Sequence, residues 1–283
     1  MKMLKYILIG LLLWFVIELY IDNHTFEITK YRIKDKKIGN SFQNYKIVQL
    51  SDLHGKRFGR NNTHLLRTID KIQPNLIVMT GDMVNNANQD FETLFALISS
   101  LYEKYPIYYI KGNHEQGLSS ENKKVLYDFL IANEVKYLEN EKDVIKIGKD
   151  SINLFGMWSD LAFEKQNGEK KFSLSYMKKL MENAPISKNE FNILLAHNPN
   201  QIDIYSKWGA DLTLSGHIHG GMVRLPIVGG IFSPDTFLFP KFSKGKYEVN
   251  GKSLIVSRGL GRGRRGFRLF NRPELAVIEL ENM

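Results

Sequence analysis

The chain has 283 residues, a formal net charge of +9 and a hydrophobic content of 43%. This composition allows a sizeable core in one large α/β domain and excludes a globally disordered chain. Cysteine is absent, which excludes disulfides, thiolate metal sites and cysteine nucleophiles. The positive charge favours anionic partners, such as phosphate esters, nucleic acid or acidic lipid surfaces, without choosing among them.

The first segment is strongly apolar. Lys2 and Lys5 precede an unbroken apolar run over residues 6–17, and residues 4–21 are just long enough for a membrane span. No small-residue cleavage site follows, so we expect an uncleaved membrane anchor over residues 1–24 rather than an amphipathic or buried first helix. Basic residues flank both ends, and we favour a single-pass topology with the following domain on the outer face of the cytoplasmic membrane.

Strands and helices alternate through residues 25–283, which we expect to form one domain. Helices are predicted near residues 62–72, 90–104 and 119–133. Strands are predicted at 46–50, 75–80, 107–110, 152–155, 191–196, 211–214, 246–249, 253–257 and 274–280. Apolar strands that alternate with helices indicate βαβ units and a parallel sheet buried on both faces. Asn250–Gly251 is a typical hairpin turn between two of the later strands.

Five of these strands are followed at once by side chains that can bind metal. The residues are Asp52 and His54, Asp82, Asn113 with His114 and Glu115, His197, and His217 with His219. Parallel strands bind ligands at their carboxyl ends, so we expect these side chains to converge. Taken alone, a His-x-His pair is more typical of a solvated turn, but five of the seven histidines lie at these strand ends.

A converging set of this kind needs counter-charge. Buried carboxylates and imidazoles require partners, and the set holds more acceptors than donors. Divalent metal ions resolve that imbalance, whereas the alternative is a series of separately satisfied capping residues. Oxygen and imidazole ligands without thiolate suit Mn, Fe, Zn or Ni, and the number of ligands favours two ions, with Mn preferred.

The ordered motifs resemble those of the calcineurin-like metallophosphoesterases. They are Asp52-x-His54, Gly81-Asp82, Gly112-Asn113-His114-Glu115, His197 and Gly216-His217-x-His219, and the resemblance covers about residues 44–281. It implies an α/β fold of the αββα type, in which helices flank a two-sheet β-sandwich. It also implies two metal sites, one formed by Asp52, His54 and His219 and the other by Asn113, His197 and His217, with Asp82 bridging them.

The resemblance further implies hydrolysis of a phosphodiester or pyrophosphate bond. Two cations would neutralise the anionic substrate and lower the pKa of a bridging water, whose hydroxide attacks phosphorus. His114 would be the general acid for the leaving group or a stabiliser of the transition state, the alternative being a structural role. Glu115 is expected to support the site rather than to act chemically.

Residues beyond the last histidine resemble a bacterial membrane-anchored branch of this family, which includes UDP-2,3-diacylglucosamine pyrophosphatase-like enzymes. The similarity lies in residues 219–226, 239–242 and 257–261, although Met222 replaces a usual glutamine and an arginine-rich run follows Gly261. The branch implies a lipid- or envelope-linked phosphate ester as substrate. The alternatives are a nuclease, a cyclic-nucleotide phosphodiesterase, or a non-catalytic anion-binding protein.

Two further segments are candidates for binding substrate or membrane. Five arginines lie between residues 258 and 268, and Arg224 lies shortly after the last histidine. We expect Arg224, Arg258 and Arg262 to reach a phosphate or a lipid headgroup. The alternative is that the arginine-rich run is a solvated basic loop. The loop 225–242 either folds back on the core or dips its aromatic tip into lipid. We expect a monomer that binds the membrane through residues 4–21 and has no specific nucleic-acid partner.

Overall fold

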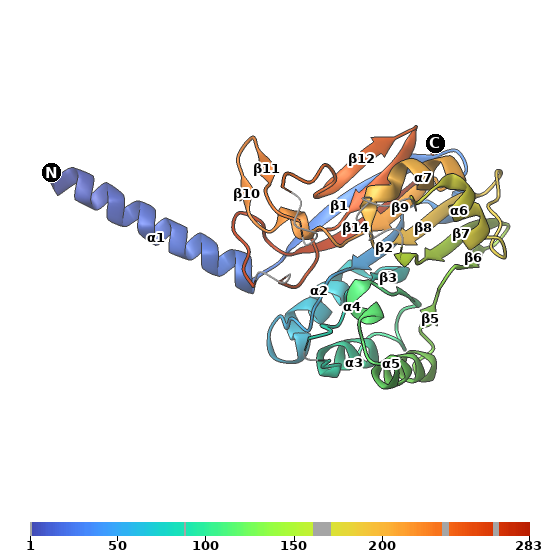
Figure 1. Ribbon diagram of the computed structural model, residues 1–283, viewed down its shortest axis with the longest axis horizontal. Coiled ribbons are helices and arrows are strands. Elements are labelled where there is room, and N and C mark those ends of the chain that lie inside the picture. Colours follow the sequence, from blue (N-terminus) through green and yellow to red (C-terminus); the bar gives the residue numbers. More distant parts are fainter. Residues whose placement is uncertain (1, 88, 161–170, 234–237, 263–265) are drawn as a thin grey trace.

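Two six-stranded β-sheets form the body of the molecule, and helices cover their outer faces (Figure 1). The computed structural model describes residues 2–87, 89–160, 171–233, 238–262 and 266–283. This architecture confirms the sandwich expected from the sequence, with an apolar N-terminal helix that projects from the body.

The first sheet carries the βαβ units predicted in the first half of the chain. Its order is β1 (Glu27–Asp35), β14 (Glu274–Asn282), β2 (Tyr45–Leu50), β3 (Leu76–Thr80), β4 (Ile107–Ile110) and β5 (Lys136–Tyr137). Strands β2 to β5 are parallel, and β14 runs antiparallel to β2. The helices of this half are α2 (Thr63–Ile72), α3 (Glu92–Ser99), α4 (Asn113–Gln116) and α5 (Ser120–Ala132).

The second sheet is built from the second half of the chain. Its order is β12 (Gly245–Val249), β13 (Lys252–Val256), β9 (Leu212–Ser215), β8 (Phe191–Ala196), β7 (Asp150–Met157) and β6 (Glu141–Ile147). Helices α6 (Leu174–Leu180) and α7 (Ile202–Trp208) pack on it. The predicted Asn250–Gly251 turn joins β12 to β13 with both residues in the left-handed region.

The central strands consist mostly of apolar residues because both of their faces are buried. In β2, Ile47 packs between the two sheets, whereas Val48 packs under the helices of the first sheet. In β3, Val78 and Met79 divide between the same two layers. Successive side chains of a strand point to opposite faces, so a strand between two packed layers requires an unbroken apolar run. This run is the signal that made the strands predictable.

Strand β1 was not predicted. It pairs in parallel with the last strand, β14, along nine residue pairs from Glu27–Glu274 to Asp35–Asn282. Its alternating Lys30, Arg32 and Lys34 form ion pairs with Glu279 and Glu281 on β14. These basic residues, which resemble the charged flank of a membrane segment, therefore belong to the edge of the first sheet.

Helix α1 (Lys2–His24) is exposed over residues 2–17 and becomes buried toward its end, at Asp22 and Asn23. The helix is long and apolar enough to cross a membrane. Asn23 Nδ2 donates to the carbonyl of Arg268 (2.8 Å), and the Arg268 N–H donates back to Asn23 Oδ1 (3.0 Å). Asp22 Oδ2 accepts from the N–H of Asn271 (3.0 Å). The helix end is therefore hydrogen-bonded to the loop that precedes β14.

The exchange between Asn23 and Arg268 predicts that the last turn of α1 stabilises the domain. Asn23→Ala leaves a buried N–H and a buried carbonyl without their partner, and we expect the free energy of unfolding to fall by about 1–3 kcal/mol. Denaturant unfolding of the full-length protein in detergent measures this change. His24→Ala is the matched control because His24 is exposed in the same turn. Equal stability of the two variants would contradict the prediction.

Candidate functional site

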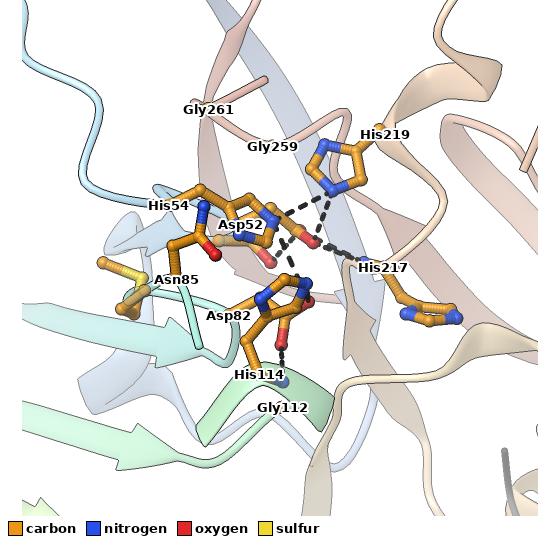
Figure 2. Close-up of polar contacts among 12 residues, drawn as sticks. Asp52, His54, Asp82, Asn85, Gly112, His114, His217, His219, Gly259 and Gly261 are labelled. Carbon is orange, nitrogen blue, oxygen red and sulfur yellow. Dashed lines mark hydrogen bonds and ion pairs between the residues drawn. The ribbon is translucent and has the colours of Figure 1, made fainter. Parts of the chain in front are cut away.

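The carboxyl ends of β2, β3, β4, β8 and β9 meet at one place, where the two sheets adjoin. Asp52 and His54 follow β2, Asp82 follows β3, Asn113 and His114 begin α4 after β4, His197 follows β8, and His217 and His219 follow β9. Asp52, His54 and His219 have ligand atoms within 4.8 Å of one another, as do Asp82, His197 and His217. Figure 2 shows His54, Asp82 and His219 turned toward a common point. The structure thus brings together the side chains singled out in the sequence.

The backbone at this place is unusual. Five candidate ligands have a positive φ angle: Asp52 (51°), His54 (48°), Asp82 (52°), His217 (71°) and His219 (52°). Such left-handed conformations are rare for residues other than glycine and persist where surrounding structure fixes them, often at functional sites. They turn the chain sharply after each strand, so that consecutive polar side chains point back into one space.

Gly81 illustrates how closely the strand ends approach. Its φ is +87°, and an added Cβ would lie 2.6 Å from the backbone nitrogen of Gly112 and 2.9 Å from Nδ1 of His197. Both separations are far below van der Waals contact. A glycine is therefore required before Asp82 if β3, β4 and β8 are to deliver their side chains to the same place.

Asp52 lies at the centre of the first group and is completely buried. Its carboxylate accepts from Ser51 Oγ (2.6 Å) and from the backbone N–H of His217 (3.1 Å). His219 Nε2 lies 3.4 Å from Asp52 Oδ1 and 3.1 Å from His54 Nε2. Two imidazole nitrogens and a carboxylate oxygen are thus directed at one small volume.

Both rings of the first group are neutral at physiological pH. Burial lowers the pKa of His54 to about 4. Burial, the His54 ring and the nearby Arg268 guanidinium together hold the pKa of His219 well below its usual range. A neutral imidazole offers a lone pair, so both residues are in the form that binds metal.

Asp82 links the two groups. Its Oδ2 lies 3.2 Å from His197 Nε2 and 3.8 Å from His54 Nε2, while Oδ1 accepts from the backbone N–H of His114 (2.8 Å). His197 Nδ1 lies 2.7 Å from the carbonyl of Thr80, which can only accept a hydrogen bond. Nδ1 of that ring therefore carries a proton, and Nε2 faces Asp82. Metal-binding histidines are commonly oriented by a carbonyl in this way.

Asn113 tests whether the residues fit a metal. Its buried Oδ1 has no hydrogen-bonding partner in the part of the chain that the structure describes. A buried carbonyl oxygen without a donor costs about 1–3 kcal/mol, and a cation satisfies it. Together with the carboxylates and imidazoles, this oxygen gives a donor set suited to divalent ions.

Glu115 lies behind the site and does not point into it. Its carboxylate accepts from the backbone N–H groups of Asp82, Met83, Val84 and Gly112 and from the hydroxyl of Tyr109. Burial and the charge of Asp82 raise the pKa of Glu115. The side chain therefore holds the turns after β3 and β4 in place, which is the supporting role expected from the sequence.

His114 has a defined orientation. Its Nδ1 accepts a hydrogen bond from the backbone N–H of Asn86 (3.3 Å), and its Nε2 lies 3.9 Å from Asp82 Oδ2. Because a backbone N–H can only donate, the neutral ring carries its proton on Nε2. This proton is directed at the cluster, because Nε2 faces Asp82. The side chain is 21% exposed, so solvent can reach it.

The three arginines proposed to bind phosphate contact other parts of the protein. Arg224 donates to the carbonyl of Gly220 (2.7 Å), and Arg262 donates to the carbonyl of Asn23 (3.0 Å). Arg258 is buried and forms ion pairs with Glu27 and Glu274. Arg224 and Arg262 are partly exposed, whereas the charge of Arg258 is neutralised. Two arginines of the same run, Arg264 and Arg265, lie outside the described residues.

Two residues near the site were not singled out in the sequence. Arg268 is fully buried, with Nη2 3.3 Å from His219 Nδ1, and it donates to the carbonyls of Arg258 and Gly261. Asn271 Nδ2 donates to the carbonyl of His219 (2.7 Å). Arg268 was one of several arginines in a glycine-rich run, and no local signal distinguished it.

Comparison with known proteins identifies the family. A family model for calcineurin-like phosphoesterases matches residues 45–221, a range that contains every candidate ligand. The chain belongs to the calcineurin-like phosphoesterase family. The resemblance inferred from the motifs is confirmed at that level, and the protein is a metal-dependent phosphoester hydrolase whose clustered side chains could hold a pair of divalent metal ions.

Calcineurin-like relatives match the chain over most of its length. The uncharacterized metallophosphoesterase YkuE of Bacillus subtilis (strain 168) is 28% identical over 268 residues, which cover 93% of this chain and 88% of YkuE. Phosphodiesterase YaeI of Escherichia coli (strain K12) is 27% identical over 274 residues, covering 92% and 90%. The crystal structure of TT1561 of Thermus thermophilus shares the fold, with a TM-score of 0.50 and 12% identity over 78% of this chain and 90% of that one.

The electrostatics of His197 predict that metal binding strengthens as pH rises. Burial opposes a charge on this ring, but the Asp82 carboxylate outweighs burial and raises the pKa of His197 to about 10. A metal bound by His197 must displace that proton, so below the raised pKa the binding of this ion releases a proton. We expect the affinity for Mn²⁺ to increase up to about tenfold per pH unit between roughly pH 6 and 9. Calorimetric titration in two buffers of different ionisation enthalpy counts the protons, and a pH-independent affinity would contradict the prediction.

Proposed function

We propose that the protein is a two-metal phosphohydrolase that cleaves a phosphodiester or pyrophosphate bond in a lipid- or envelope-linked substrate. The observation that carries the proposal is the position of Asp82 between two groups of ligands, 3.2 Å from His197 in one and 3.8 Å from His54 in the other. One carboxylate within reach of two cation sites is the arrangement that a paired metal centre requires.

The two sites divide the ligands as follows. Asp52, His54 and His219 would hold one ion, Asn113, His197 and His217 would hold the second, and Asp82 would be shared between them. The orphaned oxygen of Asn113 and the orientation of His197 by Thr80 support this division. Oxygen and nitrogen donors without sulfur favour Mn²⁺. Bound ions would supply the positive charge that holds the phosphoryl oxygens and would activate a water for attack.

His114 stabilises the leaving group by hydrogen bonding. Its Nε2–H is directed at the cluster, because Nδ1 is occupied by the Asn86 N–H. As the bond between phosphorus and the leaving oxygen breaks, the Nε2–H would donate a hydrogen bond to that oxygen and stabilise its developing negative charge, and water would supply the proton. The partial exposure of the ring lets a substrate approach it.

Helix α1 holds this chemistry at a membrane. The helix is long and apolar enough to span one, and residues 2–17 are exposed. We assign residues 1–24 to the anchor and place the catalytic domain on the outer face of the cytoplasmic membrane. Of the basic candidates, Arg224 and Arg262 are assigned to the phosphate or headgroup of the substrate, since the ion pairs of Arg258 favour a structural role.

Asp82→Asn tests the paired centre. We expect metal-dependent hydrolysis of bis-p-nitrophenyl phosphate with Mn²⁺ to fall by more than about a hundredfold, since even residues that only orient ligands change activity by about 10–100-fold. The full-length protein in detergent is used, and its bound metal is counted by mass spectrometry. Asp128→Asn is the matched control, because Asp128 is an exposed carboxylate on α5. Full activity of Asp82→Asn, or wild-type protein that binds no metal, would refute the two-metal proposal.

His114→Ala tests this stabilisation of the leaving group. The loss of kcat is expected to be about 10²–10⁴-fold for a diester with an alkoxide leaving group. It should be much smaller for bis-p-nitrophenyl phosphate, because p-nitrophenolate leaves readily without a proton. Binding of Mn²⁺, measured by calorimetry, should stay unchanged. A structural role for His114 would instead lower both activities by the same factor.

A further inference from the structure

The loop before β14 runs beside the middle of α1. The ring of Phe270 stacks on Trp14 with centroids 5.6 Å apart and an interplanar angle of 25°. Trp14 lies eight residues before Asp22, the buried residue at the helix end, or about 12 Å along the helix axis. The globular domain therefore does not end where α1 joins it, and part of it lies alongside the helix.

The hairpin β10 (Arg224–Leu225) and β11 (Gly229–Gly230) is attached to that same loop. Val223 forms a parallel β-bridge with Leu269, and the N–H of Arg224 donates to the Leu269 carbonyl (3.0 Å). Residues 238–239 pair in turn with the strand that leaves the hairpin, through the N–H of Phe239 and the carbonyl of Ile231. Figure 1 shows β10 and β11 on the side of the domain from which α1 projects.

These segments expose a concentration of large apolar side chains. We name this set the apolar face: Leu225, Ile227, Val228, Leu238, Phe239 and Phe267. Ile227 is fully exposed, and the exposed fractions of Leu238 and Phe239 are 60% and 59%. Outside α1, ten large hydrophobic residues are exposed in the described part of the chain, and six of them belong to this face. Such a concentration marks a surface that is covered by an apolar partner.

We propose that the apolar face is a membrane-docking surface that inserts into the bilayer leaflet through which α1 passes. The inference rests on the anchor role proposed for α1. Because Phe270 is in contact with the middle of the helix, a bilayer that surrounds α1 also surrounds this loop and reaches the hairpin bonded to it. Insertion of apolar side chains beneath the headgroups is typical of interfacial segments.

Charge at the edge of the apolar face fits the same occupant. Arg224 forms the base of the hairpin, Lys241 follows the exposed Phe239 by two residues, and Arg262 donates to the helix end. Basic side chains at this level attract anionic lipid headgroups. From the tip of the hairpin to its base, the exposed side chains change from apolar to basic. A bilayer changes in the same order, from its apolar interior to its anionic headgroups.

Docking would bring the candidate metal centre to the membrane surface. The hairpin begins only three residues after Gly221, which ends the short helical turn His219–Gly221. The Arg224 side chain donates to the carbonyl of Gly220, and the N–H of Ile231 donates to the carbonyl of Gly221 (3.3 Å). The hairpin is thus bonded to the turn that carries His219. The substrate class that suits this arrangement is an amphiphile whose phosphodiester or pyrophosphate lies in the headgroup layer.

Single-cysteine labelling tests the docking surface, since the chain has no native cysteine. Ile227→Cys and Phe267→Cys are each labelled with the fluorophore NBD in the full-length protein, reconstituted in vesicles of phosphatidylcholine and phosphatidylglycerol. Ile131→Cys is the matched control, because Ile131 is 73% exposed on α5, away from α1. Lipids with a doxyl group near the headgroup should quench the labels at positions 227 and 267 at least about threefold more than the control.

A fourth label separates the two proposals. Leu11→Cys lies in the exposed middle of α1 and should be quenched by lipids with a deep doxyl group. Quenching at position 11, with positions 227 and 267 behaving like position 131, would overturn the docking surface while leaving the anchor intact. Absence of quenching at all positions would overturn both. Crosslinking between chains through position 227 would assign the face to a second copy instead and would also overturn the inference.

Enzyme turnover on two substrates provides a second test of the docking surface. The double variant Ile227→Glu/Val228→Glu is compared with Ile131→Glu on two diesters that share a leaving group, vesicle-embedded dioleoylglycerol p-nitrophenyl phosphate and soluble bis-p-nitrophenyl phosphate. Carboxylates resist insertion into a bilayer, so the double variant should lose about tenfold on the embedded diester and keep its activity on the soluble one. An unchanged ratio of the two activities would contradict the inference.

Discussion

The structure depends on the cost of burying charge at the meeting point of two sheets. Asp52 and Asp82 are almost completely buried beside five histidine rings, and an unpaired carboxylate in such a place would unfold the region. The fold supplies part of the compensation itself, through Ser51 and the His217 N–H on Asp52 and through the His114 N–H on Asp82. His197 pairs with Asp82 as well, and divalent metal ions would supply the rest of the compensation. Because β2, β3 and β4 belong to one sheet and β8 and β9 to the other, neither sheet forms the site alone.

The predictable part of this site is local in sequence. The candidate ligands follow strands whose side chains are buried on both faces. The end of a mostly apolar run in the sequence therefore indicates where the next polar residue lies. Strands such as β8 (Phe191–Ala196) and β3 were therefore located to within about a residue, and the convergence of their carboxyl ends follows from parallel pairing. The turn at Asn250–Gly251 was predictable for the same reason, since its geometry is encoded in two adjacent residues.

The unpredicted part is long-range. The sequence of β1 is polar and does not by itself predict a strand. Its lysines and arginine form ion pairs with glutamates nearly 250 residues later in the chain. The exchange between Asn23 and Arg268 spans 245 residues and leaves no periodic trace. The arginine-rich loop shows how composition alone misleads. Its buried guanidinium at Arg268 donates to the carbonyls of Arg258 and Gly261, and it holds the loop together beside His219 rather than facing solvent.

These long-range contacts connect the first helix rigidly to the candidate site. A domain tethered by a flexible linker samples many orientations relative to its anchor. Here only Thr25 and Phe26 separate α1 from β1, and neither forms a hinge: the Thr25 N–H donates to the carbonyl of Ile21, and Phe26 packs edge-on against Phe58. Arg268 then connects the helix end to the ring of His219. The direction in which the metal ligands face is therefore set by the direction of α1, and a membrane that fixes the helix also fixes the side from which a phosphate ester can approach.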